Sequence, residues 1–287
     1  MGEIIDGKKI AAQLDDEAAV KVASLKNNGI FPHLVVVLVG NDSASEIYVR
    51  NKDRHANKVG IKSTVIRLPE TTSEQELLNQ ITQLNNDDTV SAILVQMPLP
   101  KQIDEFKVMM AIDTRKDADG FHPMNMGRLL QNEINKTPIA CTPKGIITLL
   151  KRYNIKISGR NAVIVGRSNI VGKPMAALLL NENATVTITH SYTKNLAEIT
   201  KKADILIVAT GISHLIKANF VKNGAVVIDV GMNRDKQGKL TGDVDFDNVI
   251  DKVSYITPVP KGVGPMTIAT LMQQTVNLAE WSSKNGR

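Results

Sequence analysis

Short runs of aliphatic and β-branched residues recur along this chain, and longer amphipathic segments separate them. The runs cover residues 33–40, 61–68 and 91–97 in the first half, and 161–166, 185–190, 204–210 and 225–231 in the second half. Strands that alternate with helices in this way pair in parallel, and the helices cover the faces of the sheet. The sequence therefore predicts an α/β fold with mainly parallel sheets flanked by helices.

A break in this alternation predicts two domains. Residues 113–140 are rich in turn-forming residues, and a chain of 287 residues is long enough to bury two separate cores. We expect a first domain over 1–140 and a second over 141–265. A long helix is expected from Met266 to Trp281, and the segment 266–287 is expected to pack back on the first domain.

Local signals predict where several helices begin. The pairs Ser43–Glu46 and Ser73–Glu76 have the spacing of a capping box, in which a hydroxyl and a carboxylate satisfy free backbone amides. Pro143 and Pro174 fit the first positions of two further helices, because those positions leave the amide hydrogen unused.

Composition limits the class of protein. The net charge of +6 suggests acidic partners, but the basic residues are dispersed and aromatic residues make up 3%, which disfavours nucleic acid. The longest aliphatic run, Leu34–Val39, falls far short of the about 20 apolar residues that span a bilayer. Because the N-terminus lacks a secretory signal, we expect a cytoplasmic protein that does not bind membranes. The single Cys141 and five scattered histidines predict neither a disulfide nor a metal site.

A glycine-bearing turn follows the first strand of the second series. Gly166 ends that strand and Gly172 stands just before Pro174, so backbone amides and a helix N-terminus converge where a phosphate could bind. The usual G-x-G-x-x-G spacing is absent, and a plain turn between strand and helix is the alternative interpretation.

The next strand end indicates which dinucleotide would bind. NAD-binding folds place an acidic residue there for the ribose 2′-hydroxyl, whereas this strand ends in His190 and Ser191. Arg167 and Ser191 could instead contact a 2′-phosphate. The sequence therefore favours NADP over NAD.

Four residues of the first half are catalytic candidates. Tyr48 and Lys52 are four residues apart on an expected helix and share a face, and Gln96 follows an aliphatic strand. Asp119 lies in a glycine-bearing loop that could reach the same edge of the sheet. Each also fits an ordinary role: a solvated lysine, a core tyrosine, a capping amide or a turn aspartate.

Several longer segments together resemble the bifunctional methylenetetrahydrofolate dehydrogenase/methenyltetrahydrofolate cyclohydrolase family. They include VGRSNIVGKPM and YITPVPKGVGPMTIATL, and they cover residues 45–61, 93–100, 116–129, 141–150, 165–175, 227–234, 242–246 and 255–271. The resemblance implies a folate-binding catalytic domain, a Rossmann-type NADP domain over 141–265, and an active-site cleft between them. It also implies NADP-dependent oxidation of 5,10-methylenetetrahydrofolate and hydrolysis of the methenyl product to 10-formyltetrahydrofolate, as part of one-carbon metabolism and purine biosynthesis.

The resemblance also assigns roles to residues. It makes Lys52 the catalytic lysine supported by Gln96, with Tyr48 stacking near the folate and Asp119 hydrogen-bonding the pterin. The residues that it assigns to the nucleotide are Gly166, Arg167, Ser168, Ser191 and Met232. The loop that it expects to close over folate and nicotinamide contains Pro260, Gly264, Pro265 and Thr267.

The same resemblance implies a homodimer and a folate substrate with a polyglutamate tail. Three residues depart from the family pattern: Lys261 stands where a glycine is usual, Ala118 replaces valine and Met232 replaces isoleucine. Glycine adopts backbone conformations that lysine does not adopt easily, so Lys261 could alter the closing loop. A different loop would change the balance between the dehydrogenase and cyclohydrolase activities. Two alternatives stay open, namely a dehydrogenase without the hydrolytic step and a non-catalytic NADP-binding or RNA-binding regulator.

Overall fold

The computed structural model describes residues 1–235 and 237–284 of the chain. Contacts divide these residues into two compact units. One unit contains residues 1–12 and 140–267, and the other contains residues 13–139 and the chain from Ile268 onward. Each unit has its own parallel sheet.

The unit of residues 13–139 is built on a three-stranded sheet in the order β3-β2-β4. The strands are β2 (His33–Val39), β3 (Lys62–Leu68) and β4 (Ala92–Val95), and β2 pairs in parallel with both neighbours. Every residue of β2 is buried, because helices cover both faces of this continuous aliphatic strand.

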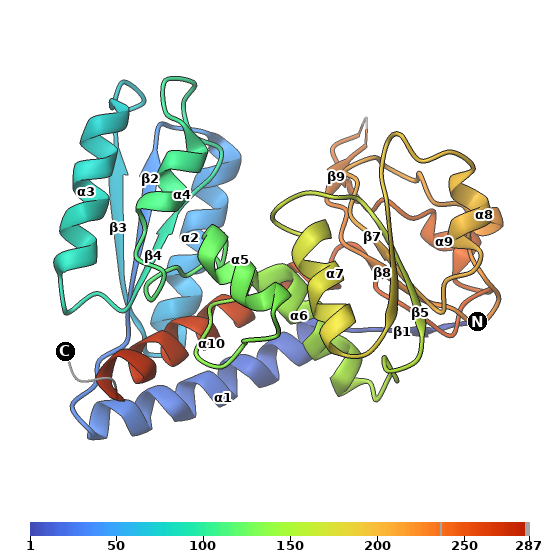
Figure 1. Ribbon diagram of the computed structural model, residues 1–287, viewed down its shortest axis with the longest axis horizontal. Helices are drawn as coiled ribbons and strands as arrows, with labels where there is room; N and C mark the ends of the chain where they lie inside the picture. Colours follow the sequence, from blue (N-terminus) through green and yellow to red (C-terminus); the bar gives the residue numbers. More distant parts are fainter. Residues whose placement is uncertain (236, 285–287) are drawn as a thin grey trace. The chain divides into compact units, whose positions relative to one another are not determined.

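Helices α3 (Glu74–Asn86) and α4 (Glu105–Ala111) pack on one face of this sheet, where Val35, Val37 and Val39 contact Leu77 and Ile81. Helix α2 (Ser43–Lys58) lies on the opposite side, as Figure 1 shows. A short helix α5 (Pro123–Leu130) follows the loop that contains Asp119. The unit also contains most of α1 (Gly7–Asn27) and of α10 (Val263–Lys284).

The second unit carries a six-stranded sheet in the order β1-β11-β8-β7-β5-β6, with all neighbours parallel. Its strands are β1 (Glu3–Ile4), β5 (Asn161–Val165), β6 (Thr185–Thr189), β7 (Ile205–Val208), β8 (Val226–Asp229) and β11 (Tyr255–Ile256). The chain leaves β5 towards β6 and then continues on the other side with β7, so the strand order reverses at β5. Open α/β sheets bind ligands at the carboxyl ends of strands beside such a reversal.

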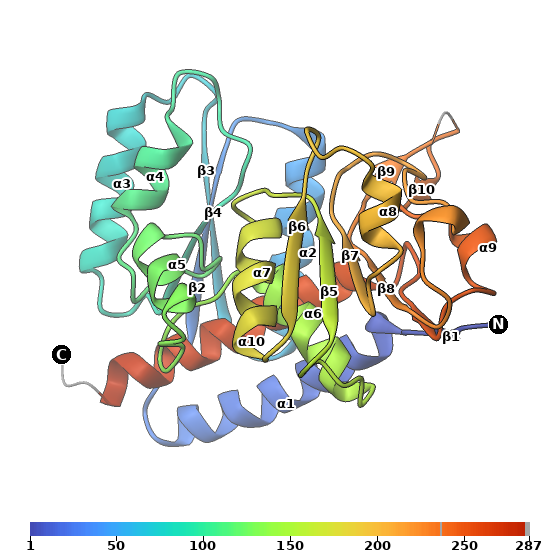
Figure 2. The same ribbon diagram turned by 45° about the vertical axis from the view of Figure 1, so that its right-hand side comes forward.

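Helices flank this sheet as well. Figure 2 shows α6 (Cys141–Arg152) and α7 (Gly172–Asn181) on one side, and α8 (Leu196–Thr200) and α9 (Phe246–Val249) on the other. The core on the α8 and α9 side joins valines of β5 to side chains of β7 and β8. The remaining elements are a 3-10 turn (Ala218–Phe220) and an antiparallel pair, β9 (Asn233–Arg234) and β10 (Leu240–Thr241).

The predicted α/β class is confirmed, and each of the seven expected strand runs contains an observed strand. Residues 1–12, which we expected in the first domain, belong to the other unit, because β1 pairs with β11 of the six-stranded sheet. Strands of two residues have no periodic pattern, so the sequence did not reveal this pairing. Residues 285–287, the end of the segment expected to pack on the first domain, lie outside the described residues.

The helix starts differ in part from the prediction. Ser73–Glu76 forms the expected capping box, whereas Ser43–Glu46 does not. Asp42 caps α2 instead, because its carboxylate accepts a hydrogen bond from the Ser45 amide at 2.7 Å. Pro143 and Pro174 are the third residues of their helices rather than the first, a position where the missing amide hydrogen is equally unused.

Candidate active site

The centre of the first candidate cluster is a hydrogen bond from Nζ of Lys52 to Oε1 of Gln96, at 2.9 Å. Lys52 lies on α2, and Gln96 directly follows β4. The amide nitrogen of Gln96 donates to the carbonyl oxygen of Met97 at 2.7 Å, which orients the amide oxygen towards the lysine. Both side chains are half-buried. The sheet edge and the helix therefore hold one lysine amine in a fixed position.

Asp119 belongs to the same cluster electrostatically. Burial raises the pKa of its carboxyl group to about 6; the positive charge of Lys52 opposes this shift, and the negative charge of Asp117 adds to it. A carboxyl group with a pKa near neutrality in a polar cluster is typical of functional sites.

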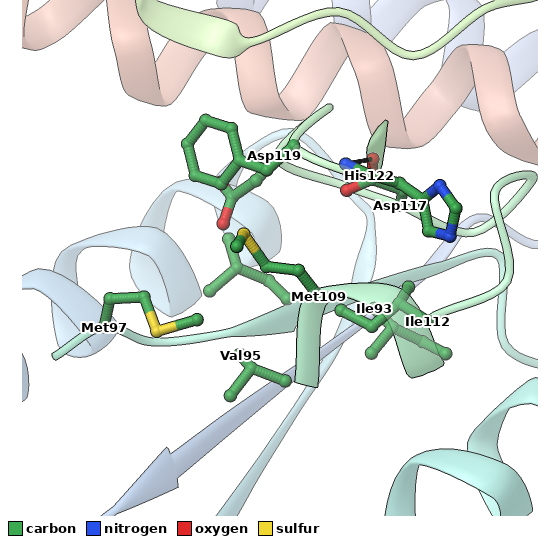
Figure 3. A pocket seen from close by; sticks show the side chains of 10 residues that line it. Ile93, Val95, Met97, Met109, Ile112, Asp117, Asp119 and His122 are labelled. Carbon is green, nitrogen blue, oxygen red and sulfur yellow. Dashed lines mark hydrogen bonds between the residues drawn. The ribbon is translucent and has the colours of Figure 1, made fainter. Parts of the chain in front are cut away.

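A cavity of about 20 Å³ adjoins Asp119, large enough for about one water molecule. Figure 3 shows that side chains of β4 and its neighbours surround this cavity, including Met97 and Met109. The mostly apolar lining removes solvent from the Asp119 carboxylate, which is the physical reason for its raised pKa.

The loop that carries Asp119 is held by residues that the sequence analysis did not select. Asp117 is buried and accepts hydrogen bonds from the amides of Gly120 and His122, both at 2.9 Å. Gln274 of α10 donates to the carbonyl oxygen of Ala118 at 2.8 Å. The D-x-D spacing in this loop was a usable signal for Asp117, whereas nothing near Gln274 in the sequence indicated its contact.

Tyr48 lies one helical turn before Lys52, and 39% of its surface is exposed. The structure thus places Tyr48, Lys52, Gln96 and Asp119 in one unit. The exposed ring of Tyr48 offers a flat apolar surface on the same helix face as the lysine.

In the other unit, the turn after β5 requires glycine. Gly166 has a φ of +128°, and a Cβ atom there would lie 2.2 Å from the carbonyl oxygen of Ala209. A Cβ atom on Gly172 would lie 2.3 Å from the carbonyl oxygen of Gly166. These two glycines allow the strand end, the turn and the start of α7 to approach one another closely.

The side chain of Ser168 occupies two backbone amides at the start of α7. Its hydroxyl oxygen accepts hydrogen bonds from the amides of Val171 at 3.2 Å and Gly172 at 3.4 Å. Amides that the sequence analysis assigned to a phosphate are therefore engaged by a side chain. These two amides are therefore not free at the start of α7.

Arg167 lies in the same turn, directly before Ser168. It is exposed, and its guanidinium lies 5.6 Å from the ring centre of Tyr192, which follows Ser191 after β6. Arg167 and Ser191 thus come from the ends of two adjacent strands, β5 and β6. Tyr192, which is 79% exposed, was not selected from the sequence, although an aromatic residue beside Ser191 was a usable signal.

The remaining candidates of this unit lie on three segments. Met232 follows β8 and is half exposed. The hydroxyl groups of Thr267 and Thr142 share a hydrogen bond of 2.8 Å. Pro260 is exposed before Lys261, while Gly264 and Pro265 belong to the first turn of α10 rather than to a loop.

Helix α10 begins three residues before the expected start at Met266, because Pro265 is tolerated in a first helical turn. Lys261 has a φ of +82°, a conformation that favours glycine.

Within residues 1–235 and 237–284, no helix is both long and apolar enough to span a membrane.

Two family models match nearly the whole chain. The model described as tetrahydrofolate dehydrogenase/cyclohydrolase, catalytic domain, matches residues 5–119. The model described as tetrahydrofolate dehydrogenase/cyclohydrolase, NAD(P)-binding domain, matches residues 140–283. The first match contains the Lys52 and Gln96 pair, and the second contains the turn at Gly166.

Similar proteins give the same result. The bifunctional protein FolD of Pediococcus pentosaceus is 66% identical over 282 residues, which are 98% of this chain and 100% of that protein. The crystal structure of the bifunctional FolD methylenetetrahydrofolate dehydrogenase/cyclohydrolase from Campylobacter jejuni has a TM-score of 0.97 at 47% identity, covering 98% of this chain and 100% of that one. The Trypanosoma brucei FolD, solved with NADP cofactor and inhibitor, has a TM-score of 0.94 at 35% identity, covering 99% of both chains.

Proposed function

This chain belongs to the tetrahydrofolate dehydrogenase/cyclohydrolase family, and we propose that it catalyses two consecutive reactions of folate. It oxidises 5,10-methylenetetrahydrofolate to 5,10-methenyltetrahydrofolate with NADP, and it hydrolyses the methenyl compound to 10-formyltetrahydrofolate. The observation that carries the proposal is the Lys52–Gln96 hydrogen bond beside the half-buried Asp119, whose carboxyl group has a raised pKa.

Lys52 is the residue that moves the proton in the hydrolytic step. Water attacks the cationic methenyl carbon, and a neutral amine at Nζ accepts the proton that the attacking water releases. The C–N5 bond of the resulting carbinolamine then breaks as Nζ returns this proton to N5, and the remaining hydroxyl proton leaves to solvent as the formyl group forms. The amide oxygen of Gln96 carries no net charge, so it holds Nζ in place without binding the lysine as an ion pair.

Asp119 and Tyr48 position the substrate in this proposal. The carboxylate of Asp119 accepts hydrogen bonds from the donors of the pterin ring, and the mostly apolar side chains beside it limit the solvent around that contact. The exposed face of Tyr48 provides a stacking surface one helical turn from Lys52.

The dehydrogenase step depends on the other unit. NADP, when bound, supplies the hydride acceptor, so the chain itself needs to bind and orient two rings rather than to provide a base. The turn at Gly166 and Gly172 fits a dinucleotide, because a Cβ atom at either position would close the approach between strand, turn and helix. Arg167 and Ser191 are suited to a 2′-phosphate, since no carboxylate stands at either strand end.

The other nucleotide assignments are proposals of the same kind. Ser168 supports the turn through its bonds to the helix amides, and the backbone at Met232 approaches the cofactor. Thr267, whose hydroxyl group shares a hydrogen bond with that of Thr142, contacts the cofactor in this proposal. The residues Pro260, Gly264 and Pro265 complete the substrate-binding part of this segment.

We further propose that the unit of residues 13–139 binds folate and that the unit of residues 140–267 binds the nucleotide. A homodimeric assembly and a folate with a polyglutamate tail are expectations that follow from the family, and the positive charge of the chain suits such an acidic tail. We also propose a cytoplasmic location.

The test is a spectroscopic assay of the purified protein with 5,10-methylenetetrahydrofolate, run in parallel with NADP and NAD. We expect reduced NADP and 10-formyltetrahydrofolate to form together, with slower turnover on NAD. Accumulation of the methenyl compound would identify a dehydrogenase without efficient hydrolysis. Folded protein that turns over neither cofactor would contradict the proposed function.

A further inference from the structure

Two buried carboxylates lie at the carboxyl ends of β7 and β8, outside the residues discussed so far. Asp229 ends β8 and is 3% exposed, and Asp243, in the GDVDF segment, is fully buried. Buried carboxylates are rare unless they are hydrogen-bonded, so their partners indicate what the pair holds in place.

Asp243 accepts four hydrogen bonds from two separate loops. Its Oδ2 atom accepts from the amide of Thr210 at 2.6 Å, the hydroxyl of Thr210 at 2.9 Å and the amide of Gly211 at 3.0 Å. Its Oδ1 atom accepts from Nδ2 of Asn233 at 2.8 Å. One carboxylate therefore joins the loop after β7 to the segment after β8, in which Asn233 follows Met232.

Asp229 fixes the backbone of Asp243 in turn. Its carboxylate accepts hydrogen bonds from the amides of Asp243 at 3.0 Å, Val244 at 2.9 Å and Gly231 at 2.9 Å. Burial, together with the nearby charge of Asp243, raises the pKa of Asp229 to about 7 against the effect of these three amides.

The close packing around Asp229 and Asp243 explains why two nearby positions are glycine. A Cβ atom on Gly231 would lie 2.2 Å from Oδ1 of Asp243, and one on Gly242 would lie 1.9 Å from Oδ2 of Asp229. Both distances are far below van der Waals contact. The two carboxylates thus fill positions that only glycine leaves open, and any side chain at either glycine would displace them.

The loop that Asp243 holds, residues 209–211, packs against the glycine-bearing turn after β5. Ala209, the residue before Thr210, has its carbonyl oxygen 2.2 Å from where a Cβ atom of Gly166 would stand. A shift of residues 209–211 would therefore move the backbone against which Gly166 packs. The same carboxylate also sets the position of Asn233, next to Met232.

We propose that Asp243 is a positioning residue for the dehydrogenase step, which it supports by fixing the loops after β7 and β8 at the nucleotide edge of the six-stranded sheet. The inference rests on the proposed function and deepens it. Asp243 and the Lys52 cluster belong to different units. Loss of its hydrogen bonds should therefore weaken NADP binding and leave hydrolysis of methenyltetrahydrofolate intact.

The variant Asp243→Asn tests this inference because it preserves size while removing one acceptor atom. An amide has a single acceptor oxygen, so either the loop at Thr210 or the side chain of Asn233 loses its partner. We expect the Kd for NADP, measured by calorimetry, to rise at least about tenfold, with KM for NADP rising in parallel. Hydrolysis of methenyltetrahydrofolate, assayed without NADP, should stay within about twofold of the wild type.

Asp247→Asn is the matched control, because it removes an exposed carboxylate of α9 and should change neither property. Adding Asn233→Asp to Asp243→Asn reverses the direction of the hydrogen bond between these two side chains. That double variant should recover part of the NADP affinity, which a role limited to general stability would not produce.

Unchanged NADP affinity in folded Asp243→Asn, or an equal loss of both activities, would overturn the inference. If Asp243→Asn does not fold, Asn233→Ala removes one of the four hydrogen bonds and should weaken NADP binding selectively; unchanged affinity there would overturn it as well. Wild-type protein that binds NADP but turns over no folate would instead contradict the proposed function and leave this binding comparison valid.

Discussion

Nζ of Lys52 and Oε1 of Gln96 are joined by a hydrogen bond of 2.9 Å, and the Gln96 amide is itself held by the carbonyl oxygen of Met97. A helix side chain and a strand end thus meet at a neutral acceptor. Because Gln96 has no net charge, this contact is a hydrogen bond to a neutral acceptor and not an ion pair.

Gln96→Glu should impair hydrolysis while leaving the position of the lysine almost unchanged. A carboxylate at this place would form an ion pair with the charged lysine and favour the form that cannot accept a proton. We expect hydrolysis of methenyltetrahydrofolate to fall by about 10²-fold, measured by the loss of its absorbance. Gln102→Glu, a change of the same type at a glutamine that bonds the carbonyl oxygens of Glu70 and Thr72, serves as the control. Equal rates for wild type and Gln96→Glu would contradict the assigned role of the neutral amide.

Asp119→Asn should change how stability depends on pH. Since the pKa of Asp119 is raised to about 6 in the folded protein, folding favours the protonated form, and the contribution of this group to stability falls as pH rises from about 4 through about 6. Asparagine resembles the protonated form at every pH. We therefore expect the stability of the variant relative to wild type to increase across this window and to level off above it. Chemical unfolding at several pH values measures this difference, and a constant difference would contradict the raised pKa.

Arg167→Gln should reduce the preference for NADP over NAD. A guanidinium that binds a phosphate contributes about 1.5–3 kcal/mol, which corresponds to about a 10- to 100-fold change in the ratio of kcat/KM values. Turnover with NAD should change little, because NAD lacks the 2′-phosphate. Lys202→Gln removes the same charge from an exposed site and should preserve the preference. An unaltered preference in Arg167→Gln would exclude this arginine as its source.

Lys261→Gly should stabilise the protein. Lys261 has a φ of +82°, where a Cβ atom costs about 1 kcal/mol, although glycine offsets part of this gain through greater freedom in the unfolded chain. We expect a net gain of a few tenths to about 1 kcal/mol, measured by chemical unfolding. Lys261→Ala keeps the Cβ atom and should show no such gain; an equal gain in both variants would assign the effect to the lysine side chain instead.

The sequence predicted the larger strands because each is a run rich in aliphatic and β-branched residues and bounded by turn residues. It did not predict β1 or β11, whose two-residue pairing depends on contacts between opposite ends of the chain. Asp42 replaced Ser43 as a helix cap because two neighbouring residues could both supply a suitable oxygen atom.

In the candidate site, too, some residues could be predicted from the sequence and others could not. Lys52 and Gln96 were selected from spacing and from strand ends, since parallel strands bring their carboxyl ends to one edge. The supporting contacts of Asp117 and Gln274 with the Asp119 loop could not be derived, because buried hydrogen bonds between distant segments leave no periodic signal. The Ser168 hydroxyl was expected at a nucleotide, and its bonds to the α7 amides became visible only in three dimensions.

The most direct test of the account is the rate at which Lys52→Met hydrolyses 5,10-methenyltetrahydrofolate, corrected for the buffer rate, with NADP affinity measured on the same sample. Methionine keeps much of the length of the side chain and removes the amine. The account predicts that hydrolysis falls by at least about 10²-fold while NADP affinity stays within about twofold. Hydrolysis near the wild-type rate in a folded variant would contradict the central role of the Lys52 amine.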